Sequence, residues 1–496
     1  MTIGFNQIPG SILVPLFYAE MDNSQANYGL GAKRTLQIGQ KLAAGSAVAG
    51  TPYLVATTDQ AIALFGRGSM LARMHAKHRA NDLFGEVWVI PLDDVNAGAA
   101  ATGTITITGP ATAVGVIDLY VAGQRVQVPV GSGDTAAAIA TATAATINAA
   151  TDLPVTAAAV AAVVTVTCRW KGLTGNDITL QHAFLGQAGG EVLPAGVGLA
   201  YVAMSGGATN PPLAPAIAAM GDEEYDFVVH PYTDTTSLDA FRTEMSDSVG
   251  RWSFLRQVYG HAYTAQRGTL NALVTAGLLR NDPHHTIAGV DVDTPNPVWE
   301  YAAAYGARNA VFLSANVSRP TQSGDLNGLI PPRPGKRFTQ TERQSLLNNR
   351  IATSYVSGGL LKVERAITTY GLNASGQADA SYRDSETLHQ SAEFIRRMRS
   401  VLTGKYGRHS LADNGTPISA GAGVVTPAVL EGELDAEYLR MQNDGLVENF
   451  KAWQAARRVE RDPGNPNRVN ILLTPDYINQ LRIIAAVNQF RLQFAA

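Results

Sequence analysis

The sequence predicts an α/β core that carries an inserted β-rich domain, followed by a C-terminal α+β domain, with an extended arm at each end of the chain. Three observations indicate this class. Short apolar runs alternate with helical patterns, the composition changes abruptly around residue 96 and again after residue 202, and both chain ends show strand-like alternation. A chain of 496 residues has room for about two to four domains.

Residues 1–21 are predicted to form an extended N-terminal arm. Pro9 and Pro15 exclude a helix and disfavour a central strand position. The apolar residues that mark strand-like spacing in this arm are Ile3, Phe5, Ile12, Val14 and Leu16. Termini of this kind fray unless another element holds them, so we expect the arm to pair with a sheet.

Residues 22–95 and 203–340 are predicted to form the α/β core. Four short apolar runs, "EVWVIPL", "YDFVVHP", "FLRQVYGHAY" and "HHTIAGV", are separated by helical patterns. This alternation is typical of a mostly parallel sheet with flanking helices.

Residues 96–202 are predicted to form the inserted β-rich domain. The segment is rich in Gly, Ala and Thr, and "VIDLYVAGQRVQVPVGSGD" predicts a hairpin that turns at Ala122–Gly123. Gly- and Pro-rich stretches near 98–110 and 186–215 are interpreted as entry and exit linkers. We therefore expect a self-contained domain.

Residues 341–484 are predicted to form the C-terminal α+β domain, and residues 485–496 a strand-like arm. In "NQFRLQF", Phe490, Leu492 and Phe494 alternate with Arg491 and Gln493. That period is typical of a half-buried strand. A lone terminal strand has unpaired backbone groups, so it needs a sheet to join.

The composition limits the class of function. Hydrophobic residues make up 46% of the chain and charged residues 16%, which suits a protein packed against neighbours, although an Ala-rich enzyme fits equally. The net charge of −3 argues against a nucleic-acid binder. The N-terminus has no signal-peptide pattern, no long apolar run predicts a membrane span, and Cys168 is the only cysteine. We expect a protein made in a reducing compartment.

The motifs that could carry chemistry are weak, so no catalytic residue, cofactor or metal is expected. "GLGAKRT" at Gly29–Thr35 lacks phosphate-loop spacing and indicates a Gly-rich connector. Ser205, His230 and Asp234 could be combined into a catalytic set, but a chain of this length always offers one. The segment Asp291–Pro297 is too short and proline-rich for a calcium loop.

Two histidine pairs are also weak metal candidates. His75 and His78 have helical spacing without a third ligand in sequence, and His284 and His285 are adjacent on a predicted strand. Both pairs are interpreted as ordinary surface or loop residues.

Two charged segments near the C-terminus carry opposite signs. They suit docking between subunits or onto a partner, while two solvated helix faces explain them equally well. The basic set is Arg396, Arg397, Arg399, Lys405 and Arg408, and the acidic set is Glu431, Glu433, Asp435 and Glu437.

The order of parts and several stretches resemble the contractile-tail sheath protein family of Mu-like bacteriophages over nearly the whole chain. The stretches are "IPGSILVPLFYAE", "LYVAGQRVQVPVGSGDTAAAIA", "RWKGLTGNDITL", "RDPGNPNRVN" and "LLTPDYINQLRIIAAVNQFRL". Thr474 stands where a second proline would fit the closing motif, which is a minor departure.

The resemblance implies a structural subunit that stacks as hexameric rings around a tail tube, assembled in the host cytoplasm for the virion tail. Terminal arms would donate strands to neighbours, the insert would lie outside, and the C-terminal domain would face the tube. Implied partners are other copies, the tube protein, and baseplate and terminator proteins, without nucleic acid or membrane insertion. Another virion component, such as a capsid protein or an adhesin, and an α/β hydrolase-type enzyme remain alternatives.

Overall fold

The computed structural model describes residues 33–419 and 421–492. These residues fold as two compact units. The larger unit contains Lys33–Glu393, Asp444–Glu448 and the chain from Asp476 onward, and the smaller contains Phe394–Asn443 and Asn449–Pro475. The predicted N-terminal arm, with Ile3, Phe5, Ile12, Val14 and Leu16, lies outside the described residues, and so does Phe494.

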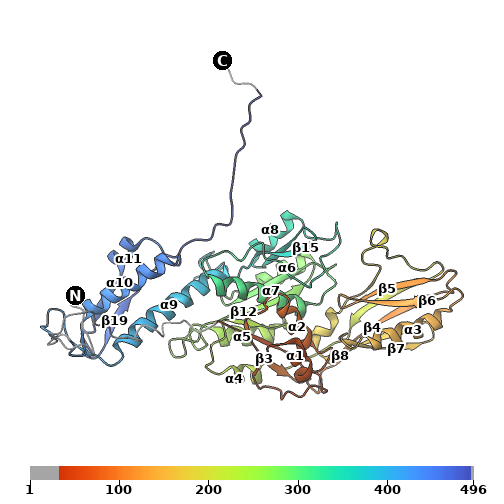
Figure 1. Cartoon of the computed structure of the whole chain (residues 1–496), viewed down its shortest axis with the longest axis horizontal. Coiled ribbons are helices and arrows are strands. Elements are labelled where there is room, and N and C mark those ends of the chain that lie inside the picture. The colour runs from red at the N-terminus through yellow and green to blue at the C-terminus, as the bar shows by residue number, and fades with distance from the viewer. Residues whose placement is uncertain (1–32, 420, 493–496) are drawn as a thin grey trace, which may run out of the picture. The chain divides into compact units, whose positions relative to one another are not determined.

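A six-stranded sheet forms the centre of the larger unit (Figure 1), in the order β13-β12-β11-β1-β3-β2. Its neighbours pair in parallel except β2, which is antiparallel at the edge. A mostly parallel sheet is what the alternating strands and helices predicted. The strands are β1 (Arg34–Gln40), β2 (Tyr53–Leu54), β3 (Glu86–Leu92), β11 (Phe227–Val229), β12 (His261–Arg267) and β13 (His285–Val290).

The central strand β1 was not expected from the sequence. It pairs with β11 on one side and β3 on the other, so that Thr35 lies opposite both Phe227 and Val87. The connector predicted over Gly29–Thr35 therefore overlaps strand β1, because Thr35 already belongs to the strand. Buried Gln37 and Gln40 weaken the apolar pattern that normally indicates a central strand.

Helices cover both faces of this sheet because its strands are apolar on both sides. Met70 of α2 and Trp299 of α7 belong to the cluster on the face with Val229, whereas Met220 of α4 and Phe241 of α5 pack on the opposite face. The helices of the larger unit's α/β part are α1 (Thr58–Phe65), α2 (Met70–Arg79), α4 (Ala214–Met220), α5 (Thr235–Met245), α6 (Leu270–Leu278), α7 (Val298–Ala315) and α8 (Gln340–Asn348).

The insert is built from two antiparallel sheets, ordered β10-β4-β8-β7 and β6-β5-β9. Ala122 and Gly123 both have positive φ and turn the β5–β6 hairpin where the sequence predicted it. The elements are β4 (Ala100–Thr108), β5 (Gly115–Val121), β6 (Gln124–Val130), α3 (Ala136–Ala149), β7 (Val155–Val160), β8 (Val163–Lys171), η1 (Leu173–Asp177), β9 (Leu180–His182), η2 (Gln187–Gly189) and β10 (Gly198–Ser205).

The stretches interpreted as linkers each contain a strand of the insert. Residues 98–110 contain β4, and residues 186–215 contain β10, which pairs antiparallel with β4. Alternation explains β4, since Ile105 and Ile107 are buried while the threonines between them point to the other side. The chain thus enters and leaves the insert through two neighbouring strands of one sheet.

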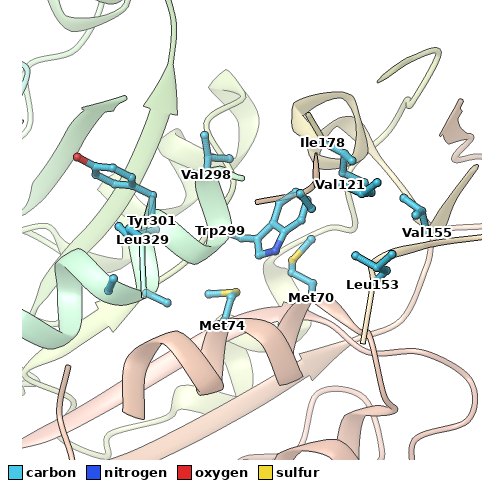
Figure 2. Close-up of a cluster of buried hydrophobic side chains, with 14 of the residues drawn as sticks. Met70, Met74, Val121, Leu153, Val155, Ile178, Val298, Trp299, Tyr301 and Leu329 are labelled. Atoms are coloured by element: carbon cyan, nitrogen blue, oxygen red, sulfur yellow. The ribbon is translucent and has the colours of Figure 1, made fainter. Parts of the chain in front are cut away.

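The insert shares its hydrophobic core with the α/β part, which corrects the expectation of a self-contained domain. Trp170 of β8 and Trp299 of α7 meet edge to face, with ring centroids 5.2 Å apart, and both are buried. Figure 2 shows Trp299 next to Met70 of α2, with Val121 and Ile178 of the insert in the same cluster.

Polar contacts join the same two parts. Arg267 of β12 donates from Nε to Asp177 of η1 at 2.6 Å, and Asp177 also accepts from the Val298 backbone at 2.6 Å. The hydroxyl of Thr179 donates to the Pro295 carbonyl at 2.6 Å. These contacts fix the orientation of the insert on the sheet.

The larger unit extends beyond the boundary predicted at residue 340. Ala352 bridges to Ala288 of β13, and Leu346 of α8 packs with Ile287 and Leu273. The hairpin of β14 (Thr353–Ser357) and β15 (Leu360–Arg365) continues this unit. The compact unit therefore includes residues 341–393, which the sequence assigned to the C-terminal domain.

The smaller unit is organised by helices around Trp453. This buried indole stacks on Tyr438 at 4.4 Å and meets the ring of Phe394 at 5.9 Å. Helix α9 begins in the larger unit and belongs to the smaller from Phe394 onward. The elements are α9 (Ser385–Tyr406), β16 (Ser410–Leu411), β17 (Val424–Val425), α10 (Pro427–Asn443), α11 (Phe450–Ala456), β18 (Arg458–Arg461) and β19 (Val469–Leu472).

The shared core predicts that the insert and the α/β part unfold together. Trp299→Ala should lower the free energy of unfolding by about 3–5 kcal/mol, because it leaves a cavity beneath both parts. In chemical denaturation of the variant, the insert and the α/β part should unfold in a single transition at a lower denaturant concentration than in the native chain. Phe84→Ala is the control, because this ring is 94% exposed and its loss should change little. Two separate transitions, with only one shifted, would contradict the shared core.

Candidate functional site

The C-terminal segment exposes a run of apolar side chains. Residues 478–492 form no helix or strand in the structure, so the strand predicted from Asn488 is absent from its described part. Phe490 is 77% exposed and Leu492 is 96% exposed. Ile483, Ile484 and Val487 before them are exposed as well. Among the described residues no element covers this run.

A two-stranded hairpin in the smaller unit has open edges. Strands β18 and β19 pair with each other, Val459 opposite Ile471, and within the described residues neither has a second strand neighbour. Helix α10 packs against β18. None of the eight strand residues is buried. A two-stranded sheet is marginal alone, so this hairpin is suited to accept further strands.

The two charged segments that the sequence singled out pair with each other. Arg397 of α9 donates to Glu437 of α10 at 2.7 Å, and Lys405 contacts Glu433 at 2.6 Å. The expectation of two separate patches therefore needs correction, because these charges neutralise each other inside the smaller unit.

The remaining charged candidates have different environments. Arg457, at the end of α11, forms ion pairs with Asp435 and with Glu431, the latter at 3.2 Å. Arg399 and Arg408 are exposed, and Arg396 is half-buried.

The histidine pairs are buried, which corrects their interpretation as surface or loop residues. His75 Nε2 lies 3.2 Å from the Val55 carbonyl, and His78 Nε2 lies 3.6 Å from Asp82. Both are on the covered face of α2. His284 and His285 are buried as well. In the described part of the chain, no group of three or more His, Cys, Asp or Glu side chains has metal-binding geometry.

A buried histidine contact links β11 to β13. His230 Nε2 and His285 Nε2 are 3.0 Å apart, and the His230 ring stacks on Phe241 at 4.0 Å. Burial lowers the pKa of His285 to about 4. Burial, followed by the nearby charge of His285, lowers the pKa of His230 well below its ordinary value. One ring nitrogen must donate and the other accept, so this contact excludes the state in which both histidines are protonated.

The Ser205, His230 and Asp234 combination does not form a catalytic set. Asp234 caps α5 by accepting from the Ser237 backbone at 3.0 Å, and it accepts from Asn210 at 2.8 Å. His230 contacts His285 instead. Ser205 is exposed at the end of β10. Each residue thus has a structural environment of its own.

Two cavities are lined by paired charges. A cavity of about 410 Å³ between α2, the β5–β6 turn and α7 contains Arg73 and Lys77, both of which pair with Glu300. A second cavity of about 270 Å³ contains Asp177 and Arg267, which also pair. Within the described residues, none of the helices has the length and hydropathy of a membrane span.

Sequence reasoning missed the polar anchor in front of the exposed segment. Arg482 ion-pairs with Asp384 and Glu386, which lie about a hundred positions earlier in the sequence. Nothing local in "INQLRII" distinguishes this arginine from the exposed Arg491. The separation of the partners along the chain hides the contact.

Three segments match descriptions of one family. Residues 96–198 match the phage tail sheath protein beta-sandwich domain, residues 206–369 the phage tail sheath protein central domain, and residues 377–491 the phage tail sheath C-terminal domain. The chain is 39% identical to the Mu-like prophage FluMu tail sheath protein of Haemophilus influenzae, over 99% of this chain and 100% of that protein.

A solved structure has a similar fold. A sheath tail protein of Desulfitobacterium hafniense has a TM-score of 0.51 at 13% identity, covering 95% of this chain and 97% of that one. A sheath tail protein of Listeria innocua has a TM-score of 0.48 at 13% identity, covering 92% and 94% of the two chains.

The buried histidines predict a loss of stability in mild acid. The pKa of His285 is lower in the folded chain, about 4, than its ordinary 6.5, so the unfolded chain binds the proton first as pH falls. Stability should be fully present above pH 6.5 and fall toward pH 4 by up to about 1.4 kcal/mol per unit for this group. His285→Gln should flatten this slope in denaturation measured from pH 7.5 to 4.5. His409→Gln, at an exposed site, should leave the slope unchanged. An unchanged slope in His285→Gln would contradict the assignment.

Proposed function

The chain belongs to the phage tail sheath protein family, and from that premise we propose that it is the subunit of a contractile sheath. It is thus a structural component of a virion tail. In the proposed assembly, subunits stack as hexameric rings around the tail tube. The terminal arms link neighbouring subunits by strand exchange, and contraction drives the tube through the host envelope.

The exposed apolar C-terminal segment is the observation that carries this proposal. Phe490 and Leu492 stand in water in the single chain and alternate with Arg491. Covering each apolar side chain contributes up to roughly 1.5–3 kcal/mol. A neighbouring sheet would cover them and also satisfy the backbone of the segment.

The open β18–β19 hairpin supplies a matching acceptor on the same kind of subunit. A strand added to its edge would turn a marginal two-stranded sheet into a larger one. Because donor and acceptor are different surfaces of one chain, the contact is heterologous and propagates to further copies. The N-terminal residues 1–21 are proposed as a second donated arm.

The proposed partners are other copies of the chain, the tail tube protein, and the baseplate and terminator proteins. We place the insert on the outside of the sheath and the C-terminal α+β domain toward the tube. Assembly would take place in the host cytoplasm. Contraction would repack subunits as rigid bodies, without a nucleotide, a cofactor or an enzymatic step.

Removing residues 485–496 tests the arm directly. The truncated chain should remain folded, with an unchanged circular dichroism spectrum, because the deleted residues that the structure describes are exposed. It should no longer form tubes in negative-stain electron microscopy. Tubes of normal length from the truncated protein would contradict strand donation, and shells or fibres from the intact chain would favour another virion component.

The alternation of the arm provides a matched pair of variants. Phe490→Ser with Leu492→Ser should raise the concentration needed for tube formation roughly 100-fold or more, because two buried side chains are lost from each contact. Arg491→Ser lies on the opposite side of the predicted strand and should assemble almost normally. Sedimentation across a concentration series measures both. Equal effects from both variants would contradict a strand that buries one face.

A further inference from the structure

The chain just before the exposed segment is fixed to the larger unit. Tyr477 bridges to Val447, and the Ile478 backbone donates to the Leu446 carbonyl at 3.2 Å. The Gln390 side chain of α9 donates to the Ile478 carbonyl at 2.9 Å. Residues 476–478 are therefore held by backbone and side-chain contacts.

Arg482 closes this anchored stretch with a cluster of charges. Its guanidinium lies 3.2 Å from Asp384 and 3.0 Å from Glu386, and the arginine side chain is only 10% exposed. Glu386 is fully buried, and it accepts from the backbone and the hydroxyl of Thr321 at 2.9 Å each. Arg365 donates to both oxygens of Asp384, at 2.8 and 2.9 Å.

The carboxylates are themselves well positioned for a cation. Asp384 and Glu386 flank the start of α9, where negative charge is stabilised by the helix dipole. Burial alone would raise the pKa of Asp384, but the hydrogen bond from Arg365 and the charges of Arg482 and Arg365 hold it below its ordinary value. Asp384 therefore stays ionised at neutral pH.

Arg482 is the last partly buried residue before the exposed run, although Leu481 before it is already 66% exposed. Ile483 is 80% exposed and Ile484 is 81% exposed. The described residues after Arg482, 483–492, are all exposed and would span roughly 33 Å if fully extended at about 3.3 Å per residue. The last anchored residue, Arg482, therefore sets the position from which the arm begins.

We propose that Arg482 is a positioning residue for assembly, which fixes the root of the C-terminal arm to the first turn of α9. This inference rests on the proposed strand donation. When a neighbour binds the chain after Arg482, tension along the arm acts on Arg482. The ion pairs transmit this force to Asp384 and to the buried Glu386. Without the ion pairs, the arm would start further back, its ends would sample a larger volume, and its effective concentration at the neighbour would fall.

Limited trypsin digestion of the full chain tests the anchor without assembly. Trypsin must take the arginine side chain into its own pocket, so an anchored Arg482 should be cut at least roughly tenfold more slowly than the exposed Arg491. Glu386→Gln keeps the shape and the acceptor for Thr321 but removes the charge. In this variant, cleavage after Arg482 should accelerate. Equal rates at both arginines in the native chain, or no change in the variant, would overturn the anchor.

Assembly then tests its role. Glu386→Gln and Arg482→Lys should each raise the protein concentration needed to form tubes by roughly 1.5-fold, because the release of residues 479–482 lengthens the free arm and effective concentration falls as about the −3/2 power of its length. Both should keep the native circular dichroism spectrum. Should one variant not fold, the other decides. Asp239→Asn, which removes an ion pair to Arg280 elsewhere in the larger unit, should assemble normally.

The outcomes separate this inference from the proposed function. Normal assembly of folded Glu386→Gln and Arg482→Lys, while deletion of residues 485–496 prevents tubes, would overturn the role of Arg482 and leave strand donation standing. Normal assembly of the deletion variant would overturn strand donation itself, and the role of Arg482 in assembly with it.

Discussion

The contact between Trp170 and Trp299 is the interaction on which the rest of the larger unit depends. It joins a strand of the insert to the helix that covers the central sheet, and both indoles are buried. Protein interiors are close-packed, so the elements on either side of this contact can slide little against each other. An insert that shares its core with its host cannot rotate without opening that core. The insert and the α/β part therefore act mechanically as one body.

The core shared by the insert and the α/β part limits which parts of the proposed assembly can move relative to each other. The insert enters and leaves through β4 and β10, which are hydrogen-bonded to each other, and Arg267 fixes Asp177 from the sheet. Movement in the proposed sheath would therefore not occur between the insert and the α/β part, and surfaces that a single chain leaves uncovered are where subunits could move against one another. The chain after Arg482 has that property, since its apolar side chains have no described partner within the subunit. Rigid bodies joined by extended segments can change their packing without unfolding.

Much of the fold could be predicted from the sequence, because its signals were local. Short apolar runs such as Val87–Ile90 and the Ala122–Gly123 turn have patterns that do not depend on distant residues. Strand β1 could not be predicted because Gln37 and Gln40 are polar residues that are buried, and burial depends on the tertiary structure. The burial of His285 was missed for the same reason.

The candidate site could be predicted only in part. Alternation in Phe490 and Leu492 predicted a strand without an obvious partner in the chain, but not the anchor in front of them, whose carboxylates are distant in sequence. The pairing of Arg397 with Glu437 likewise depends on how α9 and α10 pack, which charge patterns alone do not determine.

The exposed arm also has to avoid pairing wrongly before it meets its proper neighbour. A long apolar strand with open edges is an aggregation hazard, and Arg491 and Gln489 interrupt the apolar run at alternate positions. An arm with no regular structure in the single chain presents no preformed edge, so two arms have little to template on each other. The hairpin of β18 and β19 does present an edge, and it is short and carries Arg458, Glu460 and Arg461. In the proposed assembly, selective pairing would follow from asymmetry, because one surface is apolar and without regular structure while the other is preformed and charged.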